Sequence, residues 1–208
     1  MTQSFVADEY YLYNFDNLCV SDTRLNGHNI LTLEFSGGKA VSFFNSGLLD
    51  GSGRAGVGIL LSPIPITGLI EYEPVSERIV RARIKGRTNN LTILSVYAPI
   101  RDATEQQKDQ FFSNLQTFIG KISRKDILLI RGDFNARIDR KLNNLEQAIG
   151  KHGLGDRCTN GNRLLLFAMQ NNLAVANTWF RHKSCHTYTW KFRDGRVKAQ
   201  IDYLLVSR

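Results

Sequence analysis

The amino-acid sequence predicts an α/β sandwich, in which two β-sheets pack together and helices cover them on the outside. Two observations predict this fold class. Short runs rich in β-branched and aromatic residues fill the first half of the chain, and apolar residues take up a helical spacing only after residue 102. The 208 residues are expected to form one domain, because the chain has no repeat, low-complexity tract or linker rich in proline, glycine and serine.

Six strands are expected in the first half. The run at 78–84 shows the pattern most clearly, because its even-numbered positions from 80 onward are apolar while arginines stand at 81 and 83, as in a half-exposed strand. Gly37 and Gly38 are expected to form a hairpin turn between the second and third strands. The expected strands are residues 17–20, 28–35, 40–44, 57–61, 78–84 and 91–97.

The second half is expected to mix helices with strands. Phe111, Leu115 and Phe118 recur at helical spacing, which predicts a helix whose polar first turn contains Glu105. The apolar run at 127–130 is typical of a buried strand. The remaining expected elements are a helix at 162–171 and strands at 173–176, 187–192 and 201–206.

The composition argues against membrane-spanning and disulfide-stabilised proteins. The longest apolar stretch, residues 59–70, contains Pro63 and Pro65 and is too short to cross a bilayer. The N-terminal residues do not resemble a secretory signal, and the 3 cysteines are too scattered for a disulfide framework. We therefore expect a nuclear or cytoplasmic protein that is not secreted and has no membrane partner.

The charge balance favours a polyanionic partner. The chain has 27 Lys and Arg residues against 19 Asp and Glu residues, a net charge of +8. These basic residues form no run of five or more, so we expect a basic face on a folded domain and not a basic tail.

A carboxylate and an amide follow the apolar run at 127–130. Asp133 and Asn135 stand two residues apart, so that both side chains can point into one crevice at the end of a sheet. A carboxylate can accept a proton from water or bind a metal, and an amide can hold water or a phosphate oxygen. A simple turn formed by Asp and Asn is the alternative explanation.

Three further strands carry candidate site residues. Tyr97 ends a strand just before Pro99, and Asp202 stands in an otherwise apolar strand, where a carboxylate needs a strong partner. A core tyrosine and a salt bridge across the sheet are the alternatives for these two residues. Asp22 ends another strand, and Mg²⁺ requires only one or two carboxylates. The coincidence of several such positions favours a metal-dependent site.

These segments resemble, in order along nearly the whole chain, the motifs of the endonuclease/exonuclease/phosphatase family, which includes the apurinic/apyrimidinic endonucleases. The matching segments are Ser-Asp-Thr-Arg-Leu at 21–25, Gly-Val-Gly at 56–58, Ser-Val-Tyr-Ala-Pro at 95–99, Gly-Asp-Phe-Asn-Ala at 132–136, Tyr-Thr-Trp at 188–190 and Ile-Asp-Tyr at 201–203. Three segments are similar to endonuclease domains of RTE-type non-LTR retrotransposons, a group that includes craniofacial development protein 2-like proteins. They are Asn-Gly-Asn-Arg-Leu at 160–164, Phe-Arg-His-Lys at 180–183, and the segment at 190–203, which begins with Trp-Lys-Phe-Arg-Asp-Gly-Arg.

The resemblance implies a four-layer α/β/β/α sandwich of mostly antiparallel sheets. It also implies hydrolysis of a DNA phosphodiester by an activated water, with Mg²⁺ as the metal and Mn²⁺ as its alternative. By resemblance, Asp133 and Asn135 act on the water and the phosphate. Tyr97 contacts the phosphate, Asp22 binds the metal and Asp202 orients a catalytic histidine. The residues expected to contact DNA are Asn160, Asn162, Arg163, Lys183 and Trp190.

The sequence departs from the family pattern at three places. Residues 1–17 contain no Thr-Trp-Asn strand, Asp22 replaces the usual glutamate, and the family's closing Ser-Asp-His segment is not reached by Arg208. We therefore expect an incomplete domain that lacks its first and last strands, is impaired as an enzyme, and lacks the reverse transcriptase of a complete element. The alternatives are a non-catalytic module that binds nucleic acid or protein, another phosphohydrolase of the superfamily (an inositol-phosphate phosphatase, lipid phosphodiesterase or deadenylase), and a genomic remnant.

Overall fold

The computed structural model describes residues 3–34, 40–193 and 195–208. The chain forms two compact units, of which the N-terminal unit ends at Tyr97 and the C-terminal unit begins at Ala98. The first sheet of the N-terminal unit has the strand order β1-β4-β3-β2, with every pair antiparallel. Its strands are β1 (Asn17–Ser21), β2 (His28–Glu34), β3 (Ala40–Ser46) and β4 (Val57–Leu61). In the second sheet, β6 (Ile79–Ile84) pairs antiparallel with both β5 (Leu69–Ser76) and β7 (Leu91–Tyr97).

The two sheets of the N-terminal unit pack face to face. Val57 and Ile59 of β4, which are fully buried, share one apolar cluster with Val80 and Ala82 of β6. The spacing of two residues between these members puts each strand's contacts on one face, as a pleated strand requires. The short helix α2 (Pro63–Thr67) follows β4 and begins with a proline, which is favoured in a first helical turn.

A helix covers the other face of the first sheet. Tyr10 of α1 (Gln3–Leu12) packs with Phe43 of β3 and with Leu60 of β4. Because Leu60 lies between Ile59 and Leu61, its side chain points to the opposite face, and β4 therefore contributes to both apolar clusters.

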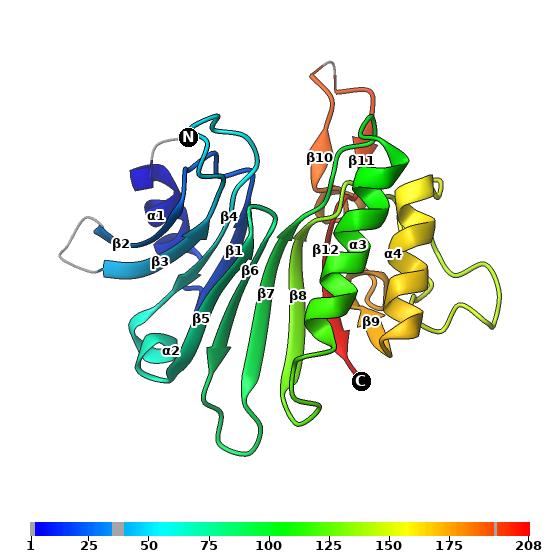
Figure 1. Ribbon diagram of the computed structural model, residues 1–208. Coiled ribbons are helices and arrows are strands. Elements are labelled where there is room, and N and C mark those ends of the chain that lie inside the picture. The colour runs from blue at the N-terminus through cyan, green and yellow to red at the C-terminus, as the bar shows by residue number, and fades with distance from the viewer. Residues whose placement is uncertain (1–2, 35–39, 194) are drawn as a thin grey trace. The chain divides into compact units, whose positions relative to one another are not determined.

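The C-terminal unit places two helices beside a sheet (Figure 1). Strand β12 (Asp202–Ser207) pairs antiparallel with β8 (Ile127–Asp133) and with β9 (Leu173–Val175). The helices α3 (Glu105–Ile119) and α4 (Thr159–Gln170) lie side by side. The ring centroids of Phe112 on α3 and Phe167 on α4 are 5.7 Å apart. A separate antiparallel hairpin consists of β10 (Trp190–Lys191) and β11 (Lys198–Ala199). Short 3₁₀ helices occur at Ala176–Thr178 and Ser184–His186.

Local sequence explains where α3 begins and which side it buries. The hydroxyl of Thr104 accepts the N–H of Gln107 at 3.2 Å, and the Gln107 side chain accepts the N–H of Thr104 at 3.0 Å. This capping box satisfies two backbone donors at the helix start. Phe111, Leu115 and Phe118 are buried, as the helical spacing predicted.

Most predicted elements are confirmed, with boundaries shifted by a few residues. The predicted strand at 187–192 is wrong in extent, because only Trp190–Lys191 is strand. The predicted turn at Gly37 and Gly38 lies outside the described residues. Helix α1 and strand β5 were not predicted. Pro74 interrupts the apolar alternation of β5, and a register shift beside it lets the strand accommodate a residue that lacks an N–H.

Among the described residues, none of the helices has the length and apolar character that crossing a bilayer requires.

A buried ion pair organises residues 134–158, which connect β8 to α4 without helix or strand. The guanidinium of Arg157 pairs with both carboxylate oxygens of Glu146, one of them at 3.2 Å, and donates to the carbonyl of Ile138 at 2.7 Å. The side chains of Arg157 and Glu146 are 13% and 10% exposed. Hydrogen bonds from Arg157 hold the pKa of Glu146 below its ordinary value of 4.5.

Substitution of Arg157 by methionine should destabilise the protein strongly. The variant leaves the buried Glu146 carboxylate without its cation, which typically costs about 3–5 kcal/mol of unfolding free energy. Urea denaturation of Arg157→Met measures this loss. Because the folded-state pKa of Glu146 is lowered, the stabilisation is present above pH 4.5 and disappears as the pH falls through the folded value.

The matched control is Arg140→Met, which changes an exposed arginine of the same segment. We expect its unfolding free energy to stay within about 0.5 kcal/mol of the parent chain. Equal effects of the two substitutions would contradict a structural role for the Arg157–Glu146 pair.

Candidate active site

Strand β8 ends at Asp133, and the chain turns around the carboxylate of this residue. The N–H of Asn135 donates to Asp133 Oδ1 at 2.7 Å, and Asn135 has a left-handed φ of 46°, a conformation that asparagine tolerates well. The turn formed by Asp and Asn is therefore present. It fixes the orientation of the Asp133 carboxylate, so the turn and a chemical role are compatible.

The same segment is joined to the start of the C-terminal unit. The N–H of Ala98 donates to the carbonyl of Asp133 at 2.8 Å, and Nδ2 of Asn135 donates to the carbonyl of Ala98 at 2.9 Å. These two bonds hold the Asp133–Asn135 turn from its backbone and from its side chain. The turn is thus fixed against an adjacent segment of the fold.

Asp202, at the start of β12, lies directly opposite Asp133 in the antiparallel register. Side chains at such positions project from the same face of a sheet, with Cβ atoms about 5 Å apart, and like charges there repel. Burial raises the pKa of Asp202 above its ordinary value of 3.8, and a hydrogen bond with Thr189 opposes this shift. Two neighbouring carboxylates favour either a proton on one of them or a cation beside them.

Thr189 is the residue that positions Asp202. Its hydroxyl oxygen accepts the N–H groups of Ile201 and Asp202, each at 3.1 Å. Among the described residues Asp202 forms no ion pair, so the salt bridge considered as its alternative role is not present. The Tyr-Thr-Trp motif at 188–190 contained the signal for Thr189, but sequence spacing gave no indication of its partner.

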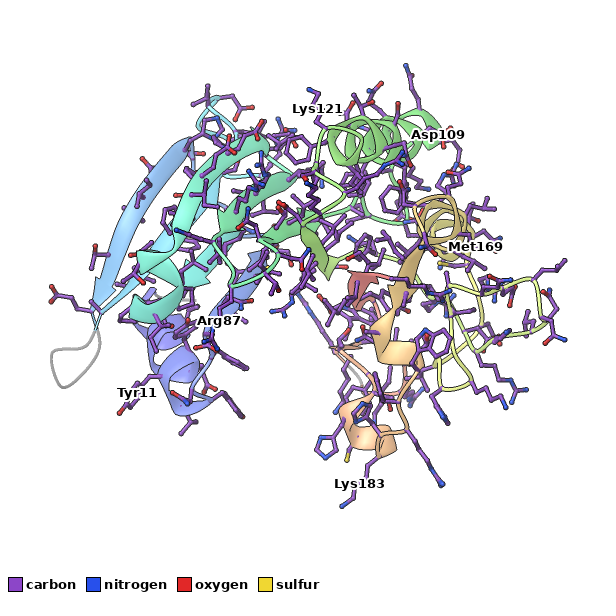
Figure 2. All side chains as sticks on the ribbon, turned by 90° about the horizontal axis from the view of Figure 1, so that it is seen from below. Tyr11, Arg87, Asp109, Lys121, Met169 and Lys183 are labelled. Atoms are coloured by element: carbon purple, nitrogen blue, oxygen red, sulfur yellow. The ribbon has the colours of Figure 1, made fainter. Side chains whose placement is uncertain are left out.

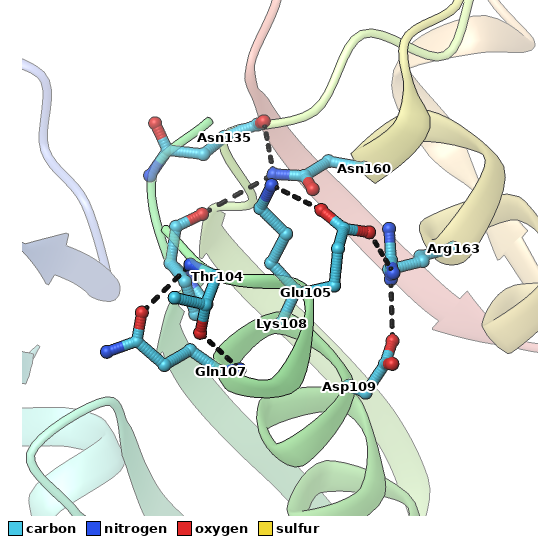
Figure 3. A network of polar contacts seen from close by, with 9 residues as sticks. Thr104, Glu105, Gln107, Lys108, Asp109, Asn135, Asn160 and Arg163 are labelled. Atoms are coloured by element: carbon cyan, nitrogen blue, oxygen red, sulfur yellow. Dashed lines mark hydrogen bonds and ion pairs between the residues drawn. The ribbon is translucent and has the colours of Figure 1, made fainter. Parts of the chain in front are cut away.

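The residues predicted to contact DNA fall into two groups. Asn160 and Arg163 are engaged inside the C-terminal unit: the amide of Asn160 bonds to backbone carbonyls, and Arg163 forms ion pairs with Glu105 at 2.7 Å and Asp109 at 2.9 Å (Figure 3). The second group lies at the surface. It consists of Asn162 on the first turns of α4, Lys183, which extends away from the ribbon in Figure 2, and Trp190 of β10, which is 41% exposed.

Asp22 and Tyr97 belong to the N-terminal unit. Asp22 directly follows β1 with a φ of 53°, and its carboxylate pairs with Arg24 at 3.2 Å. Tyr97 ends β7, is half-buried and packs against the apolar cluster between the two sheets, which agrees with the core tyrosine considered as its alternative role. The guanidinium of Arg78, which sequence analysis missed, lies 5.3 Å from the ring centroid of Tyr97 and donates to the Tyr97 carbonyl at 3.1 Å.

The donor set suits Mg²⁺ better than zinc. Across the described residues no three His, Cys, Asp or Glu side chains gather into a metal-binding group, so a closed zinc site is not formed. Mg²⁺ retains several waters and needs only one or two carboxylates, a requirement that Asp22, the predicted metal ligand, can meet.

Cys158, just before α4, is one of the 3 cysteines that the sequence analysis considered only for disulfides. Its sulfur accepts the N–H of Arg137 at 3.2 Å. Burial opposes the thiolate, but hydrogen bonds from the backbone of Arg137 and Gly161 outweigh it and lower the pKa of the thiol. These contacts connect the start of α4 to the segment that follows Asn135.

The chain is similar in sequence to craniofacial development protein 2. The proteins of Bos taurus and Tragulus javanicus are each 33% identical to it over 152 residues, which are 73% of this chain. The matched region spans only 25% and 26% of the length of these two relatives. The transposon TX1 uncharacterized 149 kDa protein of Xenopus laevis is 29% identical over 131 residues, which are 62% of this chain and 9% of that protein. No family model matches the chain.

Three solved structures share the fold. The endonuclease domain of TRAS1, a telomere-specific non-LTR retrotransposon, has a TM-score of 0.59 at 14% identity, covering 99% of this chain and 79% of that one. The AP endonuclease LMAP of Leishmania major has a TM-score of 0.67 at 12% identity, covering 98% and 73%. An endonuclease/exonuclease/phosphatase family protein of Leptotrichia buccalis has a TM-score of 0.59 at 13% identity, covering 99% and 81%. These likenesses confirm the predicted α/β sandwich.

Replacing Asp202 by asparagine should stabilise the protein at neutral pH. Burial raises the pKa of Asp202, so its ionisation opposes folding, and the neutral amide removes that opposition while still accepting a hydrogen bond. The gain should shrink as the pH falls and should vanish below 3.8, where the carboxyl of the parent chain is protonated in both the folded and unfolded states.

Urea denaturation of both chains at several pH values measures the effect. Asp156→Asn changes an exposed aspartate and is the control, for which we expect no stabilisation. A loss of stability in Asp202→Asn at neutral pH would show that the ionised carboxylate has a favourable partner.

Proposed function

We propose that this chain, a homologue of craniofacial development protein 2 with the fold of the endonuclease/exonuclease/phosphatase family, hydrolyses phosphodiester bonds of DNA and requires Mg²⁺. The observation that carries the proposal is the cross-strand pair of Asp133 and Asp202, with Asn135 fixed beside it. Two of the similar structures are named as endonucleases. We further propose that the two units work together as one endonuclease domain.

Asp133 is proposed to take the proton from the attacking water. Its carboxylate has one oxygen held by the N–H of Asn135, which fixes the orientation that proton transfer needs. Asp202, which is half-buried, is proposed in the role that the resemblance implies, namely to orient a catalytic histidine. A bound Mg²⁺ ion would polarise the phosphate and neutralise charge that develops on its oxygens.

Two residues of the N-terminal unit have further roles that the resemblance implies. Tyr97 is proposed to donate its phenol hydrogen to the phosphate as negative charge builds up, and Asp22 to bind the metal. Arg78 lies over the ring of Tyr97 and adds positive charge beside the phenol. Mn²⁺ provides the same oxygen coordination and is expected to replace Mg²⁺.

The DNA is proposed to contact the surface of the C-terminal unit. Asn162 and Lys183 are exposed and can donate to phosphates, while the indole of Trp190, 41% exposed, can stack on a base. A net charge of +8 favours such a polyanionic substrate.

A non-catalytic nucleic-acid-binding module is the second candidate function. The observation that favours it concerns Asp202. Within the described residues, its carboxyl forms a hydrogen bond with Thr189 and none with a histidine. Without an imidazole beside this carboxyl, charge in the transition state lacks one stabilising group, and such a loss commonly costs about 100-fold or more in rate. We therefore expect slow cleavage.

Nicking of supercoiled plasmid in the presence of Mg²⁺ tests the proposed function. We expect slow nicking that EDTA abolishes and that Asp133→Asn reduces by about 100-fold or more, because the amide keeps the Asn135 contact but cannot act as a base. Asp156→Asn changes an exposed aspartate and should nick at the rate of the parent chain.

DNA binding measured over a range of salt concentrations separates the two candidates. A folded chain that binds DNA with a salt-dependent affinity and does not nick it would support the non-catalytic module. Absence of both nicking and binding would contradict both candidates.

A further inference from the structure

Asn160, on the first turn of α4, touches two segments of the candidate site. Its side-chain nitrogen donates to the carbonyl of Asn135 at 3.0 Å and to the carbonyl of Pro99 at 3.4 Å (Figure 3). Asn160 is only 5% exposed. Its amide therefore links the turn after β8 to the start of the C-terminal unit.

The same two segments are already joined by backbone and side-chain bonds. Ala98 donates to the Asp133 carbonyl at 2.8 Å, and Nδ2 of Asn135 donates to the Ala98 carbonyl at 2.9 Å. Asn160 adds contacts from α4 to this arrangement. The Asp133–Asn135 turn is thereby held by its own strand, by the segment at 98–99 and by a helix.

The chemistry of the Asn160 amide does not suit a phosphate contact. A primary amide has two N–H hydrogens, and both are directed at backbone carbonyls. The remaining polar atom, Oδ1, is buried and has no hydrogen-bond partner among the described residues. A phosphate oxygen would find only an acceptor there, and acceptors repel one another.

Helix α4 gives Asn160 a rigid support. Arg163, one turn further along, forms ion pairs with Glu105 and Asp109 of α3, and its side chain is 19% exposed. These contacts fix the first turns of α4 against α3. A side chain supported in this way can hold a neighbouring turn within the small tolerance that catalysis needs.

We infer that Asn160 is a positioning residue, which holds the Asp133–Asn135 turn in its reactive geometry through the two carbonyls and makes no contact with DNA. The inference rests on the proposed function for its effect on rate. Its effect on the turn itself is independent of that function and can be measured without DNA.

The first experiment measures hydrogen exchange of the free protein. In Asn160→Ala, exchange of the amides of Ala98, Phe134 and Asn135 should accelerate about tenfold or more, because the turn loses its contacts with α4. Asn144→Ala changes an exposed asparagine and should leave these amides as they are. Unchanged exchange at all three amides in folded Asn160→Ala would overturn the inference, whether or not the chain cleaves DNA.

The second experiment separates positioning from DNA contact by kinetics. We expect Asn160→Ala to lower kcat about 10- to 100-fold with little change in KM, because a displaced turn affects the reacting groups. Asn162→Ala, at the exposed position two residues along, should raise KM with kcat unchanged. A raised KM with unchanged kcat in Asn160→Ala would make Asn160 a DNA contact and overturn the inference. Absence of cleavage by the parent chain would contradict the proposed function alone.

A near-isosteric variant covers the case in which Asn160→Ala does not fold. Asn160→Asp keeps the shape of the side chain, and its carboxyl can donate to a carbonyl only when protonated. We expect the exchange rates of Phe134 and Asn135, relative to those of the parent chain, to rise with pH as the introduced carboxyl ionises. A pH-independent ratio close to one would overturn the inference.

Discussion

The antiparallel pairing of β8 with β12 is the constraint on which the candidate site depends. It brings Asp133 and Asp202, which are distant in the chain, to directly opposite positions on one face of the sheet. Two carboxylates so placed repel each other unless a proton or a cation lies near them. A shift of this register by one residue would turn one side chain to the other face of the sheet and remove the pair.

The turn after β8 combines local and tertiary contacts. Asp133 and Asn135 form a turn that their own sequence favours, and its left-handed backbone at Asn135 suits asparagine. A local turn is weak by itself, because short segments lose much entropy on ordering. The bonds from Ala98 and Asn160 supply the additional restraint that keeps both side chains in place.

Interactions inside the C-terminal unit account for side chains that would otherwise suggest a polyanion site. Arg163 is committed to two carboxylates of α3, and Arg157 to the buried Glu146. A basic composition therefore overstates the positive charge that is available to DNA. The exposed Asn162, Lys183 and Trp190 remain as the surface contacts proposed for DNA.

The sequence by itself determined most of the elements and the site motifs. Periodicity located β4 and β7 with their observed bounds, and the motifs at 132–136 and 201–203 identified Asp133, Asn135 and Asp202, because strand alternation and turn chemistry are local properties. Only the tertiary structure decided which partners these residues have. The sequence predicted Asn160 and Arg163 as contacts to DNA. In the structure, packing of α4 directs the Asn160 amide to backbone carbonyls and the Arg163 guanidinium to carboxylates of α3. Hydrogen-bond partners of this kind depend on how distant segments meet, which no local pattern encodes.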